Sequence, residues 1–182
     1  MPCPYALCRG EAVSDMTALY IVDFGSPLGA LRATWHDGRL CSLMFTEHWH
    51  LAERTLRRRF GRFATSAATP SDLTARVDAY FRGDFAPLDG IAIDPGGTPF
   101  QQLVWAALRR IRPGETTTYA ELARTIGAPK AVRAVGAANG ANPIWLIIPC
   151  HRAIGSDGRL VGYAGGLERK RWLLTHENST RD

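Results

Sequence analysis

Residues 142–152 read NPIWLIIPCHR and hold the most informative features of the chain. The apolar residues 144–148 have the length and the β-branched content of a buried strand. Pro149 cannot continue a central strand, so we expect the chain to turn there and to present Cys150, His151 and Arg152 in succession. A thiol next to a base or a cation becomes a nucleophile because its pKa falls. The other interpretation is a core cysteine beside a hydrogen-bonded histidine, which is the usual meaning of an isolated Cys-His pair.

The composition predicts a globular protein with one domain of ordinary size or two small ones. The chain has 182 residues, of which 46% are hydrophobic, enough for a packed core. It contains no apolar run of membrane-spanning length and no secretory signal pattern, so we expect no membrane association. The four scattered cysteines (Cys3, Cys8, Cys41 and Cys150) do not suggest a disulfide framework, which predicts a cytoplasmic protein.

Charge is distributed unevenly between the two halves. Residues 1–97 carry 10 Arg and 11 acidic residues, whereas residues 98–182 carry 10 Arg, 2 Lys and 6 acidic residues. A basic half beside a neutral half suggests a polyanion as the partner of the basic half, although a mildly basic surface remains the alternative.

The first half has the pattern of a small α/β domain. Strands are predicted over residues 19–24, 31–36 and 39–45, and Asp37-Gly38 is a strong hairpin signal between the last two. A helix is predicted over residues 51–60, with its arginines on a solvated face. Ser71 is a candidate cap for a second helix whose apolar face is formed by Leu73, Val77, Tyr80 and Phe81.

A Pro-Gly-Gly cluster at residues 95–97 predicts a domain boundary. We therefore expect an α+β protein, in which residues 1–97 form a small α/β domain with a short antiparallel sheet. Residues 98–182 are expected to form a mainly helical domain. A zinc site is not expected, because no pair of candidate ligands has ligand spacing; the candidates are His36, His48, His50, Cys3, Cys8 and Cys41.

Two capping boxes begin helices in the second half, one at Thr98 with Pro99 at the first helical position and one at Thr118. The first helix is expected to end before Pro113-Gly114, with one apolar face formed by Phe100, Leu103, Val104, Ala107, Leu108 and Ile111. The second is expected to end at Gly127. A third is expected over residues 128–139, with Gly140 as its stop.

The last two of these helices form a helix-turn-helix pattern or an ordinary helical hairpin. Residues 130–139 of the second one are mostly Ala, Val and Gly, and only Lys130, Arg133 and Asn139 could reach bases. A helix face of such small side chains suits close, sequence-independent contact with a nucleic acid backbone or a narrow groove. One arginine on such a helix could enter the base stack.

Five motifs carry a family resemblance: TTYAELA at 117–123, AVRAVGAANGANP at 131–143, PCHR at 149–152, GYAGGLERKRWLL at 162–174, and His176-Glu177. In their order and spacing, residues 98–177 resemble the O6-alkylguanine-DNA alkyltransferases, also called methylated-DNA–protein-cysteine methyltransferases. The resemblance implies DNA repair in which a cysteine takes the alkyl group from O6 of a guanine flipped out of duplex DNA.

The resemblance also implies roles for single residues. Cys150 matches the nucleophile, and His151, reaching Glu177 through a water, matches the relay that removes the thiol proton. Tyr119 matches the group that stabilises the leaving guanine, and Asn142 matches the asparagine that links the helix-turn-helix to the active-site turn.

The remaining implied residues contact DNA or line the base pocket. Arg133 matches the arginine that fills the space left by the flipped base; Tyr119, Lys130, Ala131, Ala134 and Arg152 are further implied DNA contacts. Pro149, Tyr163, Ala164 and Gly165 correspond to the pocket, where Ala164 replaces a serine of some family members. No function is assigned to Trp145, which we expect to pack in the core.

The implied protein acts once, without a cofactor, as a monomer that binds double-stranded DNA containing O6-alkylguanine through the minor groove. Three alternatives are considered. A protein that recognises alkylated guanine without repairing it would lack the reactive cysteine. A sequence-specific regulator would need base-reading side chains. A cysteine hydrolase would need an oxyanion site and a recognisable His/Asn spacing.

Overall fold

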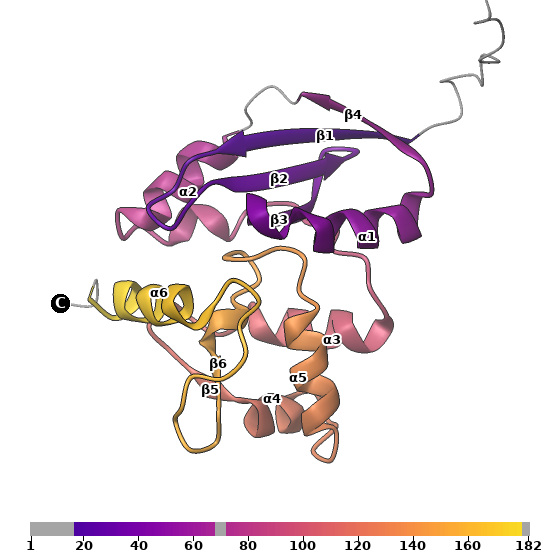
Figure 1. The fold of residues 1–182 in the computed structure, drawn as a ribbon. Coiled ribbons are helices and arrows are strands. Elements are labelled where there is room, and N and C mark those ends of the chain that lie inside the picture. The colour runs from indigo at the N-terminus through magenta and orange to yellow at the C-terminus, as the bar shows by residue number, and fades with distance from the viewer. Residues whose placement is uncertain (1–16, 68–71, 180–182) are drawn as a thin grey trace, which may run out of the picture.

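The computed structural model describes residues 17–67 and 72–179 (Figure 1). Four strands, in the order β3-β2-β1-β4, form the main sheet: β1 (Thr17–Phe24), β2 (Leu31–His36), β3 (Arg39–Phe45) and β4 (Phe63–Ala67). Strands β1, β2 and β3 pair antiparallel, and β4 pairs parallel to β1. The predicted hairpin is confirmed. Asp37 (φ 47°) and Gly38 (φ 70°) both have the left-handed backbone that a two-residue hairpin turn requires.

Helix α1 (Trp49–Phe60) lies between the sheet and the second half of the chain, and α2 (Leu73–Phe81) lies beside one end of the sheet (Figure 1). Helix α1 begins two residues before the predicted start. The predicted cap Ser71 lies outside the described residues, and Asp72 directly precedes α2. Two short 3₁₀ helices, η2 (Thr46–His48) and η3 (Ala86–Leu88), follow β3 and α2.

Helix α3 (Pro99–Leu108) begins with the predicted capping box, in which both reciprocal hydrogen bonds are present. Its buried face differs from the prediction, because Trp105 is buried and donates from Nε1 to the Ala138 carbonyl at 2.9 Å. Leu103 is 56% exposed in consequence, and the helix ends before Ile111.

The helix-turn-helix consists of α4 (Tyr119–Thr125), again with a complete capping box, and α5 (Val132–Gly140). Gly127, at φ 74°, ends the first helix as predicted. Helix α5 begins four residues later than expected, because a hydrogen bond from Ala131 N to the Ala128 carbonyl (2.8 Å) closes a turn there. A short parallel pair, β5 (Thr117–Thr118) and β6 (Ala153–Ile154), flanks this motif, and α6 (Leu167–Ser179) follows.

The strand predicted over residues 144–148 is wrong. Only Ile144 makes a bridge, to Leu43 of β3, and the chain then turns through Leu146 at φ 68°. Hydrogen bonds from Ile147 N to Trp145 O (2.9 Å) and from Ile148 N to Ile144 O (3.0 Å) hold the turn. The run is apolar because the turn is buried, and burial by itself does not require extended backbone.

Buried side chains of both halves form one continuous hydrophobic cluster. The turn at residues 144–148 joins it, through Trp145 against Phe45 and through the two hydrogen bonds between Leu43 and residues 143 and 145. The turn is thereby fixed against the sheet. The domain boundary at residues 95–97 remains a prediction.

Candidate active site

Asn142 organises the turn that ends in the short helix η4 (Cys150–Arg152). Its Oδ1 accepts from Ile144 N at 2.9 Å, and its Nδ2 donates to the Ile148 carbonyl at 2.7 Å and to Cys150 Sγ at 3.1 Å. One amide therefore fixes the start of the turn, its end and the thiol. The role of Asn142 as a link to the helix-turn-helix remains a prediction.

Cys150 is only 3% exposed. Burial raises the pKa of its thiol to about 11, although the Asn142 amide and the charge of Lys170 act in the opposite direction. The resting group is therefore a thiol near neutral pH, and a reaction at sulfur needs a base beside it.

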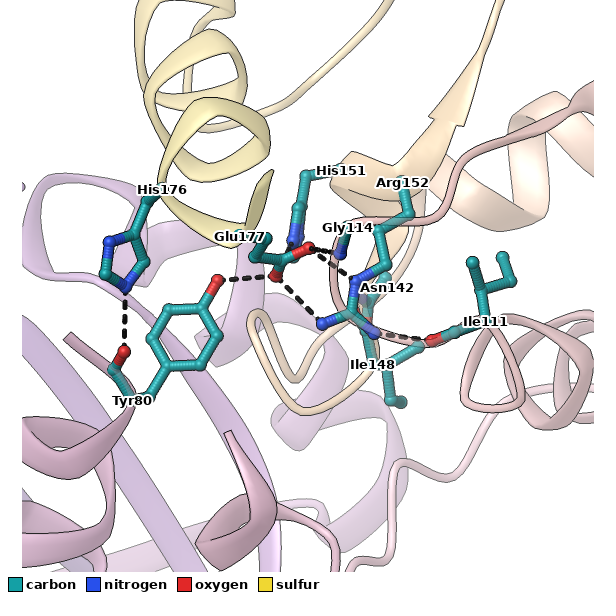
Figure 2. A network of polar contacts seen from close by, with 9 residues as sticks. All are labelled: Tyr80, Ile111, Gly114, Asn142, Ile148, His151, Arg152, His176 and Glu177. Carbon is teal, nitrogen blue, oxygen red and sulfur yellow. Dashed lines mark hydrogen bonds and ion pairs between the residues drawn. The ribbon is translucent and has the colours of Figure 1, made fainter. Parts of the chain in front are cut away.

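His151 and Glu177 are in direct contact, with Nε2 and Oε1 2.8 Å apart and both side chains fully buried (Figure 2). The expectation of a water between these two residues is wrong. Burial lowers the pKa of His151, and Glu177 only partly offsets this, so the ring is neutral near pH 7 and can accept a proton. Its other nitrogen, Nδ1, is buried and has no hydrogen-bond partner among the described residues.

Glu177 of α6 is the centre of a buried network (Figure 2). Arg152 donates to both oxygens, from Nε to Oε2 and from Nη2 to Oε1, each at 2.8 Å, and the Tyr80 hydroxyl donates to Oε1 at 2.7 Å. Burial alone would raise the pKa of Glu177, but the hydrogen bonds and charges of His151 and Arg152 outweigh it and hold that pKa well below its usual range. Glu177 is therefore a permanent anion behind the imidazole.

Arg152 is buried, and its Nη1 also donates to the Ile111 carbonyl at 2.6 Å. The prediction that Arg152 contacts DNA is wrong, since its guanidinium is held inside the protein by Glu177 and Ile111. A sequence cannot distinguish an exposed arginine from one that neutralises a buried carboxylate 25 residues away.

Two tyrosines lie near Cys150. The half-buried Tyr119 donates its hydroxyl to the Val161 carbonyl at 3.3 Å; burial and then the charge of Cys150 raise its pKa, so it stays a proton donor. Burial likewise holds the pKa of Tyr163 well above its usual value, and its hydroxyl has no hydrogen-bond partner in the described part of the chain.

The loop around Tyr163 packs too closely for a side chain at Gly165. A Cβ there would lie 2.7 Å from Tyr163 Cε1 and 3.1 Å from Trp145 Cζ3, which explains this glycine. Trp145 donates from Nε1 to the Asn142 carbonyl at 3.0 Å and packs against Tyr163. Its role as a core residue is thus confirmed, and it supports the loop. Ala164 beside it is exposed, whereas Pro149 is buried.

The predicted DNA contacts on and before α5 lie on the outside of the protein. Lys130, Arg133 and Ala134 are exposed and Ala131 is half-buried. Arg133 is the large exposed side chain on a face that otherwise carries alanine and glycine, so nothing on α5 hinders its approach to a ligand.

Two buried residues of the site were not predicted from the sequence. Tyr80 comes from α2 in the first half, and Lys170 of α6 donates from Nζ to the carbonyls of Ala153 (2.6 Å) and Val161 (2.7 Å). Burial lowers the pKa of Lys170 to about 8. Both contacts depend on the tertiary fold, and neither residue has a local signal.

Within residues 17–67 and 72–179, no group of three or more His, Cys, Asp or Glu side chains could hold a metal ion. Among the same residues, no helix is long and apolar enough to cross a membrane. The candidate ligands Cys3 and Cys8 lie outside the described residues.

Comparison with known proteins shows the family to which the chain belongs. A family model described as "6-O-methylguanine DNA methyltransferase, DNA binding domain" matches residues 99–179. The methylated-DNA–protein-cysteine methyltransferase of Salmonella typhimurium is 45% identical over 156 residues, which cover 84% of this chain and 91% of that protein. The same-named protein of Mycobacterium tuberculosis H37Rv is 44% identical over 154 residues, 85% of this chain and 89% of that one.

Solved structures give the same result. The crystal structure of Mycobacterium tuberculosis O6-methylguanine methyltransferase has a TM-score of 0.76 at 41% identity, over 90% of this chain and 95% of that one. The structure of that species' protein in complex with DNA has a TM-score of 0.74 at 41% identity, over 90% and 94%. The predicted α+β fold class is confirmed. The chain belongs to the family of methylated-DNA–protein-cysteine methyltransferases.

Proposed function

We propose that this protein repairs DNA by transferring an alkyl group from O6 of guanine to Cys150. The observation that carries the proposal is a buried thiol fixed by Asn142 beside the buried, directly bonded pair His151–Glu177. The exposed, slim face of α5 supplies a surface for DNA, and the relatives at this identity are named for the same reaction.

The first step is removal of the thiol proton. The thiol pKa of about 11 leaves little thiolate at neutral pH, so the neutral imidazole of His151, whose Nδ1 has no hydrogen-bond partner among the described residues, takes the proton. Glu177 stays ionised and stabilises the imidazolium that forms.

In the second step the Cys150 thiolate attacks the alkyl carbon. A carbon–sulfur bond forms as the carbon–O6 bond breaks, and the electron pair of that bond passes to the guanine. Tyr119, which remains protonated, donates its hydroxyl proton or a hydrogen bond to the guanine as charge develops there. The product is a thioether, which has no route back to the thiolate, so each chain reacts once and needs no cofactor.

DNA is held and opened by the exposed residues of the helix-turn-helix. Lys130 and the small residues Ala131 and Ala134 lie close to the backbone in the minor groove, in a sequence-independent manner. Arg133 enters the space left by the flipped base and offsets part of the few kcal/mol that base extrusion costs. Tyr163, Ala164, Gly165 and Pro149 line the pocket that receives the base, and the protein acts as a monomer.

The test is a titration with excess duplex DNA containing O6-methylguanine. Each chain is expected to accept one methyl group and then stop, and mass spectrometry should place the methyl on the peptide containing Cys150. Cys150→Ala should transfer none while keeping duplex affinity. Continued turnover, or a methyl on another residue, would contradict the single-use mechanism. Binding without any gain in mass would indicate a protein that only recognises alkylated guanine.

A further inference from the structure

One side chain from the first half of the chain contacts the buried His151–Glu177 pair. Tyr80 of α2 is 1% exposed, and its hydroxyl donates to Glu177 Oε1 at 2.7 Å (Figure 2). The two residues are 97 positions apart in the sequence. A hydrogen bond from a buried hydroxyl to a buried carboxylate is stronger than one between two neutral groups. The Tyr80 hydroxyl therefore affects the position of the Glu177 carboxylate, in addition to the packing of the Tyr80 ring in the core.

The carboxylate of Glu177 is held from two sides. Oε1 contacts the Tyr80 hydroxyl, His151 Nε2 and Arg152 Nη2, whereas Oε2 accepts from Arg152 Nε and, at the longer distance of 3.4 Å, from Gly114 N. Tyr80 and Arg152 approach the carboxylate from opposite sides (Figure 2). Without the tyrosine hydroxyl, the guanidinium is the one strong donor left besides the imidazole. The carboxylate would then shift toward Arg152 and away from His151.

The Tyr80 ring is itself fixed. Its centroid lies 5.3 Å from those of Phe81 and Phe85 and 5.6 Å from that of His176. His176 Nε2 also lies 2.8 Å from the Tyr80 carbonyl oxygen. The hydroxyl is therefore presented to Glu177 in one orientation, without the freedom of a solvent-exposed tyrosine.

We propose that Tyr80 is a positioning residue for alkyl transfer, which keeps Glu177 Oε1 on His151 Nε2 while the imidazole accepts the thiol proton. This inference rests on the proposed function of Cys150. In the reaction the Tyr80 hydroxyl keeps its own proton and donates one hydrogen bond. The thiol proton passes to His151, and Glu177 remains an anion.

The pH dependence follows from the groups around the carboxylate. Burial and then the charge of Glu177 hold the pKa of Tyr80 well above its usual value, so Tyr80 does not ionise in the working range. The other titratable or charged groups facing Glu177, Tyr80 and His151 from the packed elements are Cys150, Arg152, Tyr163, Lys170 and His176. Loss of the tyrosine hydroxyl should lower the rate of alkyl transfer only at pH values where His151 must remove the thiol proton. The loss of rate should become smaller as the pH approaches the thiol pKa of about 11.

The experiment measures alkyl transfer from free O6-benzylguanine to wild-type protein and to Tyr80→Phe over a range of pH. The free base removes DNA binding from the measurement. Tyr80→Phe is expected to react about 10- to 100-fold more slowly at neutral pH, the effect of one hydrogen bond to a charged group, and the difference should narrow as the pH rises. Its affinity for duplex DNA should equal that of the wild type. Tyr80→Met, which also lacks the hydroxyl, repeats the test if the phenylalanine variant does not fold.

Val77→Ala is the matched control, since it removes buried apolar volume from the same helix and leaves the Tyr80 hydroxyl and the rings around it in place. It is expected to lower the Tm without changing the shape of the rate–pH profile. A wild-type rate for Tyr80→Phe, or a loss that is the same at every pH, overturns the inference while the proposed function stands. Absence of transfer in the wild-type protein overturns the proposed function and this inference with it.

Discussion

Replacing Glu177 with glutamine tests the buried ion pair on which the site is built. The substitution keeps the size of the side chain, but it leaves the guanidinium of Arg152 buried against a neutral partner. Removing one partner of a buried ion pair lowers the free energy of unfolding by about 3–5 kcal/mol. We expect a loss at the lower end of this range, because the amide oxygen of glutamine still accepts one hydrogen bond. In a chain of this size 1 kcal/mol corresponds to about 2–4 °C, so the Tm at pH 7 is expected to fall by about 6–12 °C.

The pH dependence of the effect follows from the direction of the pKa shift. The pKa of Glu177 in the folded protein lies below its ordinary value, so the carboxylate stabilises the fold at pH values above the unfolded pKa of about 4.3. This contribution is lost as the pH falls through the folded pKa. The difference in Tm between wild type and Glu177→Gln should therefore shrink below about pH 4.

Differential scanning calorimetry of Glu177→Gln beside Glu168→Gln provides the measurement. Glu168 lies on the same helix, but its ion pair with Arg171 is exposed, with side-chain exposures of 89% and 58%. Such a pair contributes about 1 kcal/mol or less, so the control should lose no more than about 4 °C. Equal Tm values for the two variants would refute the reasoning.

Three further predictions concern the chemistry of the site. Arg133→Ala is expected to slow repair of duplex DNA far more than reaction with free O6-benzylguanine, because the side chain is exposed on α5; equal slowing on both substrates would exclude a role in opening DNA. In Glu177→Gln the rate of transfer should be low at neutral pH and rise toward the thiol pKa of about 11; a rate–pH profile identical to wild type would exclude the relay. Asn142→Ala removes three buried hydrogen bonds and should lower the free energy of unfolding by about 2–4 kcal/mol in a urea titration; an unchanged midpoint would show that the amide does not hold the turn.

The parts of the fold that the sequence predicts well are those that a few adjacent residues determine. Asp37-Gly38 specifies the hairpin because both residues tolerate a left-handed backbone. The capping boxes at Thr98 and Thr118 satisfy their own helix ends, and both helices begin where predicted. None of these features needs a distant partner.

The errors arise where distant contacts decide the structure. The run at residues 144–148 is buried between the two halves, and its hydrogen bonds to Leu43 could not be inferred from the run itself. Arg152 is predicted to contact DNA because the sequence does not show that its guanidinium pairs with Glu177. The hydroxyl of Tyr80 belongs to the site only because α2 packs against α6.

The bridges that β3 makes with residues 93 and 144 also protect the sheet from misassembly. Strand β3 lies at the end of the strand order and would otherwise present a long, hydrophobic edge with unpaired backbone groups. Leu40 instead exchanges hydrogen bonds with Ala92 and Asp94, and Leu43 exchanges them with Pro143 and Trp145. An exposed edge of this kind recruits strands from other molecules. A fragment containing only residues 1–97 would lose the cover at Leu43, and its expected fate is aggregation. The turn that ends at Cys150 thus also covers part of the β3 edge.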